Sequence, residues 1–415
     1  MSAQFFSSLA DNALLVAAIE LLKSSGAPAW QVPALAPMFA LFYVLLAPLV
    51  GAFADAWPKG QVMFFSNSIK FVGCLLMLFG GHPLLAYAVV GLGAAAYSPA
   101  KYGILTELLP PSQLVKANGW IEGLTVASIV LGVVLGGQLI GPHVAPMLVS
   151  LGEPLLNTPS EAAIAVIALL YVVAAIVNLY VPLTGTKPRP MGHSLTTLVT
   201  DFWRCNRLLW QDKLGQISLA TTTLFWGVSG NLRVIVFAWA AAALGYTTSQ
   251  ASTLAGVVVL GTAVGAVAAS IWMRLDQAVK VIPLGVLMGV LLVGLNFIDN
   301  VWVAAPFLVL LGLLGGYLVV PMNALLQHRG HNLMGAGRSI AVQNFNEQAC
   351  ILALGALYTL MARLGFSAYV AIGILGALVA ATMWAIGRLH RYNLHTHPDE
   401  VARLLRIARS DCDCH

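Results

Sequence analysis

The chain has 415 residues, of which 59% are hydrophobic and only 9% charged, and its formal net charge is +5. Soluble domains carry charge on about a quarter of their residues, so this composition excludes an ordinary soluble protein and indicates a membrane protein. In such a protein an excess of Lys and Arg indicates orientation in the bilayer, and no nucleic-acid partner is expected.

Twelve apolar stretches are long enough to cross a bilayer as helices, since a span needs roughly 20 residues. In chain order they cover residues 4–24, 31–54, 61–81, 83–107, 117–141, 161–183, 214–244, 248–273, 280–298, 301–326, 337–363 and 367–389. The longest polar interruption divides them into six and six. The prediction is an all-α membrane protein with an N-terminal half (1–183), a cytoplasmic linker (184–213), a C-terminal half (214–389) and a basic cytoplasmic tail (390–415).

The two six-helix halves are related by a fixed offset in the sequence. An offset of 222 residues links Asp11 with Arg233, Pro99 with Pro321 (321 − 99 = 222), Lys101 with Asn323, and Lys116 with Arg338. Polar groups therefore recur at matching depths of two pseudo-repeated halves. This arrangement is typical of secondary transporters, whose binding sites lie between repeats near the middle of the membrane.

The distribution of Lys and Arg predicts the orientation of the spans. These residues gather in the loops after spans 2, 4, 6, 8 and 10 and in the tail, whereas the opposite loops hold only Lys23 and Arg363. Because positive charge favours the cytoplasmic side, both termini are expected there. Lys70, Lys101 and Arg233 remain inside the membrane.

The turn after span 2 carries a candidate gate. Its sequence, from Gly51 through Asp55 to Lys59, resembles the loop signature of the major facilitator superfamily. Asp55 is able to cap a helix N-terminus and to pair with a cation across the halves, which would close one end of a transport path. Asp276 and Lys280 repeat the spacing of Asp55 and Lys59 in the second half. The alternative is an ordinary solvated turn.

A second group of polar side chains lies within the predicted spans. An ionised side chain in the bilayer costs about 2.5–3.5 kcal/mol unless it finds a partner or water. One alternative is internal pairing, for example of Asp11 with Arg233; the favoured interpretation is a wet cavity that binds a zwitterionic or phosphorylated substrate. The candidate ligands are Asp11, Asn12, Lys101, Arg233, Asn323, Gln343, Asn344 and Glu347.

The end of the chain gives two weaker signals. Val401, Leu404, Leu405 and Ala408 fall at helical spacing, which favours an amphipathic helix on the inner membrane surface, with a solvated tail as the alternative. The run Cys412-Asp413-Cys414-His415 has no second ligand pair nearby, so neither a metal site nor a cofactor is expected.

Several runs together identify a family. They are Ala10-Asp11-Asn12-Ala13-Leu14-Leu15, the stretch from Gly91 through Tyr97-Ser98-Pro99-Ala100-Lys101-Tyr102-Gly103 to Leu105, Leu114–Gly119, Leu224–Gly227, Val320–Gln327, and Ala341–Asn344 with Glu347. With these runs the chain resembles the bacterial lysophospholipid transporter family, a branch of the major facilitator superfamily, over nearly all its length before about residue 390.

The resemblance implies a function. Members move lysophospholipids such as lysophosphatidylethanolamine from the outer to the inner leaflet of the cytoplasmic (inner) membrane, where an acyltransferase/acyl carrier protein synthetase partner restores the second acyl chain. The headgroup residues it implies are Asp11, Lys101 and Arg233. The alternative is a proton-coupled exporter of amphipathic drugs. An enzyme is not expected, because no histidine lies in a nucleophile–base motif.

Overall fold

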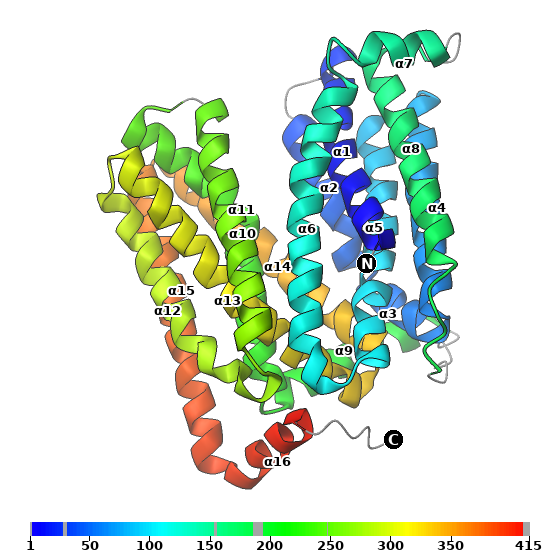
Figure 1. Cartoon of the computed structure of the whole chain (residues 1–415). Coiled ribbons are helices and arrows are strands. Elements are labelled where there is room, and N and C mark those ends of the chain that lie inside the picture. Colours follow the sequence, from blue (N-terminus) through cyan, green and yellow to red (C-terminus); the bar gives the residue numbers. More distant parts are fainter. Residues whose placement is uncertain (1, 28–30, 153–155, 186–193, 247, 410–415) are drawn as a thin grey trace. The chain divides into compact units, whose positions relative to one another are not determined.

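The structure is a computed structural model that describes residues 2–27, 31–152, 156–185, 194–246 and 248–409. Within these ranges the regular elements are all helices, as Figure 1 shows. The predicted all-α fold is therefore confirmed. The run from Cys412 to His415 lies outside the described residues.

The chain divides into two compact units. Unit 1 contains Met1–Leu108, Leu124–Trp203 and Gly335–Asn344, and unit 2 contains Leu109–Gly123, Arg204–Met334 and Phe345–His415. Two long helices, α6 (Pro111–Leu139) and α14 (Ala336–Arg363), therefore contribute their first turns to one unit and their remainder to the other.

Unit 1 is built around the packing of α1, α4, α5 and α8. Its complete helices are α1 (Ser2–Ser24), α2 (Gln31–Leu45), α3 (Ala47–Ala56), α4 (Lys59–Leu78), α5 (Pro83–Leu108), α7 (Ala145–Gly152) and α8 (Pro159–Asn178). Helix α4 packs on α5 and α8, and α1 packs on α8. Leu14, Val90 and Ile167 are among the fully buried side chains of this core. The start of α8 is fixed by a capping box between Thr158 and Glu161.

Unit 2 has a second core. Its complete elements are α10 (Gly215–Leu244), α11 (Thr248–Trp272), η1 (Leu275–Val281), α12 (Ile282–Gly294), η2 (Leu295–Phe297), α13 (Val301–Met334), α15 (Ala368–Thr396) and α16 (Pro398–Arg409), where η denotes a 3₁₀ helix. Helix α11 packs closely along α13: a Cβ at Gly261 would collide with the carbonyl oxygen of Val309, and one at Gly312 with that of Val258. Small residues allow this approach, as is common between membrane helices.

Most of the long helices are able to cross a membrane. In the described part of the chain nine helices are long and apolar enough, and eleven spans result if each of two bent pairs counts as one. One bent pair, α2 and α3, turns by 68°, and Pro48 in the first turn of α3 explains the break, since proline lacks a backbone donor. Helix α14 is the remaining long helix; its first half is polar. The protein is thus a multi-pass membrane protein, consistent with twelve predicted spans.

Two amphipathic helices lie outside the spans. Helix α9 (Leu195–Gln211) occupies most of the predicted linker and was not expected; it buries Leu198, Phe202 and Leu209 at helical spacing. Helix α16 follows the predicted helical spacing of the tail, but Val401, Leu404 and Ala408 are buried within unit 2, where α16 packs on η1 and α15. Figure 1 shows α16 turning back from the end of α15.

Candidate functional site

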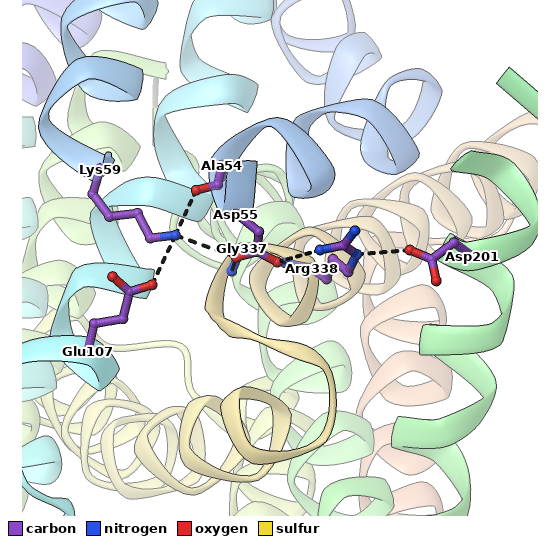
Figure 2. Close-up of polar contacts among 7 residues, drawn as sticks. All are labelled: Ala54, Asp55, Lys59, Glu107, Asp201, Gly337 and Arg338. Carbon is purple, nitrogen blue, oxygen red and sulfur yellow. Dashed lines mark hydrogen bonds and ion pairs between the residues drawn. The ribbon is translucent and has the colours of Figure 1, made fainter. Parts of the chain in front are cut away.

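A continuous polar network lies in unit 1, around the end of α3 (Figure 2). Five elements contribute to it: α3, α4, α5, α9 and the first turn of α14. We call its members the Asp55 network; they are Asp55, Lys59, Glu107, Asp201, Gly337 and Arg338.

Asp55 caps the start of α14. Its Oδ1 accepts a hydrogen bond from the backbone N of Gly337 over 2.6 Å, and its Oδ2 accepts one from the backbone N of Arg338 over 3.0 Å. The Arg338 guanidinium adds an ion pair to Oδ2 at 3.2 Å. The first N–H groups of a helix lack partners within the helix and carry partial positive charge, so a buried carboxylate stabilises this end of α14.

Lys59 of α4 also contacts the carboxylate of Asp55. Its Nζ donates to the carbonyl oxygen of Ala54 over 2.6 Å and lies 3.4 Å from Oδ1 of Asp55. It also pairs with Oε1 of Glu107, at the end of α5, over 3.0 Å. All three ionisable side chains are buried, so loss of any one of them would leave an uncompensated charge between α3, α4 and α5.

Arg338 extends the network to α9. Its Nε donates to Oδ2 of Asp201 over 2.8 Å, while its Nη1 remains on Asp55. The side chain of Asp201 is 38% exposed, so this end of the network reaches solvent. One guanidinium therefore links α14, α3 and α9.

The corresponding residues of the second half are arranged differently. Asp276, at the start of η1, pairs with Arg274 at 3.3 Å and with Arg409 of α16 at 3.0 Å. Lys280 is exposed. The spacing of Asp55 and Lys59 is thus repeated in the sequence, but in unit 2 Asp276 binds two arginines, Arg274 beside it and Arg409 of the tail.

A second cluster of polar groups lies among α1, α4 and α8 in unit 1. We call it the Asp11 cluster, and its members are Ser7, Asp11, Asn67, Lys70 and Tyr171. Nζ of Lys70 donates to both carboxylate oxygens of Asp11, over 2.9 Å to Oδ1 and 2.8 Å to Oδ2. The hydroxyl of Tyr171 donates to Oδ1 over 2.7 Å. Asp11 is therefore paired with Lys70; Arg233, the partner named in the alternative interpretation of the sequence, has a side chain that lies outside the described residues.

The other predicted ligands are spread over both units. In unit 1, Nδ2 of Asn12 donates to the carbonyl oxygen of Ser8, Nζ of Lys101 lies 4.4 Å from the ring centre of Tyr102, and Asn344 donates to Ser98 over 2.9 Å. Gln343 is buried in the same unit. Asn323 and Glu347 are buried in unit 2.

Several polar contacts of the structure are not among the residues predicted from the sequence. Lys70 was recognised as a charge within a span but not as a site residue, although its need for a partner was a signal. In unit 2, Asn118 and Gln327 exchange two hydrogen bonds, and Arg329 binds both oxygens of Asp212. Asn118 and Gln327 belong to two of the runs that carry the family resemblance.

Unit 2 also contains a partly open apolar pocket among α10, α11, α12, α13 and α15, lined by residues such as Phe225, Met288 and Leu318. Its volume is about 30 Å³.

Comparison with solved structures shows the fold. The human organic anion transporter MFSD10 (TETRAN) superposes with a TM-score of 0.72 at 13% identity, covering 93% of this chain and 98% of the other. The transporter FucP in its outward conformation gives a TM-score of 0.66, also at 13% identity, with 93% and 98% covered.

Comparison of sequences is more specific. The sequence model of the Major Facilitator Superfamily matches residues 1–348. Lysophospholipid transporter LplT of Yersinia pestis (strain Pestoides F) is 42% identical over 366 residues, covering 88% of this chain and 86% of the relative. The protein of the same name from Yersinia pseudotuberculosis serotype IB (strain PB1/+) gives the same values. The chain therefore belongs to the major facilitator superfamily and, within it, to the lysophospholipid transporter family.

Proposed function

We propose that this protein transports lysophospholipids such as lysophosphatidylethanolamine, moving them from the outer to the inner leaflet of the bacterial cytoplasmic membrane. The observation that carries the proposal is 42% identity to a lysophospholipid transporter across 88% of the chain. A transporter also explains why charged side chains are kept within the apolar helices of unit 1. Such groups are costly in a membrane and mark substrate paths.

The headgroup binds the polar side chains of the spans. Lys101 or Arg233 lies near the phosphate, since Arg binds phosphate through two parallel hydrogen bonds and Lys acts as a point charge. Asp11 or Glu347 lies near the headgroup amine. The amide groups of Asn12, Asn323, Gln343 and Asn344 suit the remaining hydroxyl and ester oxygens.

The acyl chain stays in a lateral gap between spans, in contact with lipid. Burial of a CH₂ group is worth about 0.8 kcal/mol, so moving a whole chain through water is prohibitive.

Transport proceeds by alternating access, in which the halves 1–183 and 214–389 rock about the site, joined by the linker 184–213. The Asp55 network acts as a cytoplasmic gate: it holds the first turn of α14 on α3, whereas the rest of α14 belongs to unit 2. Asp276 and Lys280 belong to the corresponding gate region of the second half. Both termini and the tail 390–415 face the cytoplasm, where an acyltransferase/acyl carrier protein synthetase re-acylates the product.

The test is uptake by the purified protein in liposomes. Labelled one-chain and two-chain phospholipids are added to the outer leaflet, with and without a proton gradient. The proposal predicts selective movement of one-chain lipids. Movement of amphipathic drugs driven by the gradient, with no movement of lysophospholipids, would instead identify a proton-coupled exporter.

A further inference from the structure

Lys70 is completely enclosed by protein. Its side chain is 1% exposed, and its Nζ lies 5.2 Å from the ring centre of Tyr97 and 5.5 Å from that of Tyr171. Gly93 of α5 makes room for the aliphatic stem, because a Cβ there would come within 2.6 Å of Cγ of Lys70. Two runs that carry the family resemblance thus supply the surroundings of this lysine, one with Asp11 and the other with Gly93 and Tyr97.

The ammonium group of Lys70 has no hydrogen-bonding capacity left for a ligand. An ammonium has three N–H donors. Two are directed to the oxygens of Asp11, at 2.9 and 2.8 Å, and the third to the hydroxyl oxygen of Ser7 at 3.0 Å. The Ser7 hydroxyl in turn donates to Oδ1 of Asn67 over 2.8 Å. Lys70 is therefore not a phosphate ligand; its effect on a substrate has to pass through Asp11.

Asp11 is the accessible end of the pair. Its side chain is 21% exposed, compared with 1% for Lys70. Oδ1 accepts hydrogen bonds from Lys70 and Tyr171, whereas Oδ2 accepts only one, from Lys70, among the described residues. Each carboxylate oxygen has two lone pairs. One acceptor position on Oδ2 thus remains for a ligand, and a hydroxyl or an ammonium group is able to donate to it.

The charge of the pair decides which headgroup it favours. Asp11 and Lys70 together are neutral, so the carboxylate neither attracts an ammonium strongly nor repels an anionic lipid. An unpaired carboxylate would do both. We propose that Lys70 determines headgroup specificity: by neutralising Asp11 it allows the site to accept lysophospholipids whose headgroup ends in a hydroxyl as well as those that carry an amine. This inference rests on the proposed function.

The test compares two lysophospholipids in liposomes made of uncharged lipid. Lysophosphatidylethanolamine carries an ammonium, and lysophosphatidylglycerol carries hydroxyls and a net negative charge. The measured quantity is kcat/KM for lysophosphatidylethanolamine divided by kcat/KM for lysophosphatidylglycerol. Lys70→Met is expected to raise this ratio by about tenfold or more. The reason is that the carboxylate of Asp11, no longer neutralised, acts on the headgroup charge over several ångströms at an effective dielectric constant of about 20.

Three further variants separate this role from a purely structural one. Lys70→Arg keeps the charge and should keep the wild-type ratio. Asp11→Asn leaves the ammonium unpaired and should shift the ratio toward lysophosphatidylglycerol. Asp11→Asn combined with Lys70→Met removes both charges and should return the ratio close to the wild-type value. The exposed Lys23, changed to Met, is the matched control and should leave the ratio unchanged.

The outcomes are distinct. If Lys70→Met keeps the wild-type ratio, the role of Lys70 is overturned. If Lys70→Met does not fold, a wild-type ratio in Asp11→Asn overturns it in the same way. An equal shift in the double variant and in Lys70→Met overturns it as well, because the effect would then not depend on the charge of Asp11. If the wild-type protein moves neither lipid, the proposed function itself is wrong.

Discussion

Asn118 and Gln327 form a reciprocal amide pair: Nδ2 of Asn118 donates to Oε1 of Gln327 over 2.9 Å, and Nε2 of Gln327 donates to Oδ1 of Asn118 over 3.0 Å. Both side chains are at most 1% exposed. The pair connects the start of α6 to α13 within unit 2. A segment from the N-terminal half of the sequence is thus joined to unit 2 by hydrogen bonds between uncharged side chains.

The first prediction concerns this pair. Asn118→Ala leaves the amide of Gln327 buried without its partner, which should lower the free energy of unfolding by about 1–3 kcal/mol. Thermal unfolding in detergent measures the change. Asn118→Ala combined with Gln327→Ala should cost less than the sum of the single changes, since the groups are coupled. Gln113→Ala, on the exposed side of the same helix, is the control; equal losses in Gln113→Ala and Asn118→Ala would contradict the interpretation.

The second prediction concerns the charge of Asp55. Asp55→Asn keeps the size of the side chain but weakens its three charge-assisted contacts with α14, each worth about 1.5–3 kcal/mol, so the start of α14 should detach more often. A thiol introduced as Ser339→Cys, at a buried position of that segment, should then react faster with a water-soluble maleimide in a background without other cysteines. Asp201→Asn makes the same change at the solvent-exposed end of the network and should have little effect. An unchanged labelling rate in Asp55→Asn would rule out the gate.

The third prediction uses the glycine at the capped end of α14. A Cβ at Gly337 would come within 2.6 Å of Oδ1 of Asp55 and 2.7 Å of the carbonyl oxygen of Gly51. Gly337→Ala should therefore push α14 off its cap, at a cost of about 1–3 kcal/mol, and impair transport. At Gly123, also helical, a Cβ meets nothing within 4 Å. Gly123→Ala should be neutral or slightly stabilising. Equal changes in stability and transport in Gly337→Ala and Gly123→Ala would contradict the interpretation.

The fourth prediction concerns the proposed phosphate ligands. Lys101→Ala should weaken lysophospholipid transport by about tenfold or more, because a charge-assisted contact is worth about 1.5–3 kcal/mol. Arg233→Ala should abolish uptake while membrane insertion stays normal. Initial uptake rates at several substrate concentrations measure both. Lys116→Ala removes an exposed lysine of α6 and is the control. Normal uptake in either site variant would remove that residue from the binding site.

The fifth prediction concerns α16. Deletion of residues 398–415 removes the buried side chains of Val401, Leu404 and Ala408 and uncovers η1 and α15, on which α16 packs, so the protein should unfold at a lower temperature. Burial of one Val or Leu side chain is worth about 1.5–3 kcal/mol. Arg409→Ala removes only an exposed ion pair to Asp276 and should change stability by less than about 1 kcal/mol. An equal loss in both variants would mean that the ion pair, and not the apolar face, attaches α16.

Much of the architecture follows from the sequence, because apolar length and the positions of Gly and Pro determine where membrane helices form. The prediction for 83–107 matches α5 (Pro83–Leu108), and the prediction for 337–363 matches α14 (Ala336–Arg363). The same reasoning missed α9, since its apolar residues are too few to resemble a span and show their helical spacing only when Leu198, Phe202 and Leu209 are considered together.

The sequence alone determined that this protein is a helical membrane protein with a repeated pattern of charges, since the cost of exposing polar groups to lipid acts on each segment separately. It also identified Asp11 and Asp55 as residues that need partners. Only the tertiary structure decided which partners they have. Within unit 1 Lys70 pairs with Asp11, and within unit 2 Arg409 from the tail binds Asp276. Such pairings depend on how each helix is rotated and which helices are neighbours, and these are properties of the packed bundle that no single segment encodes.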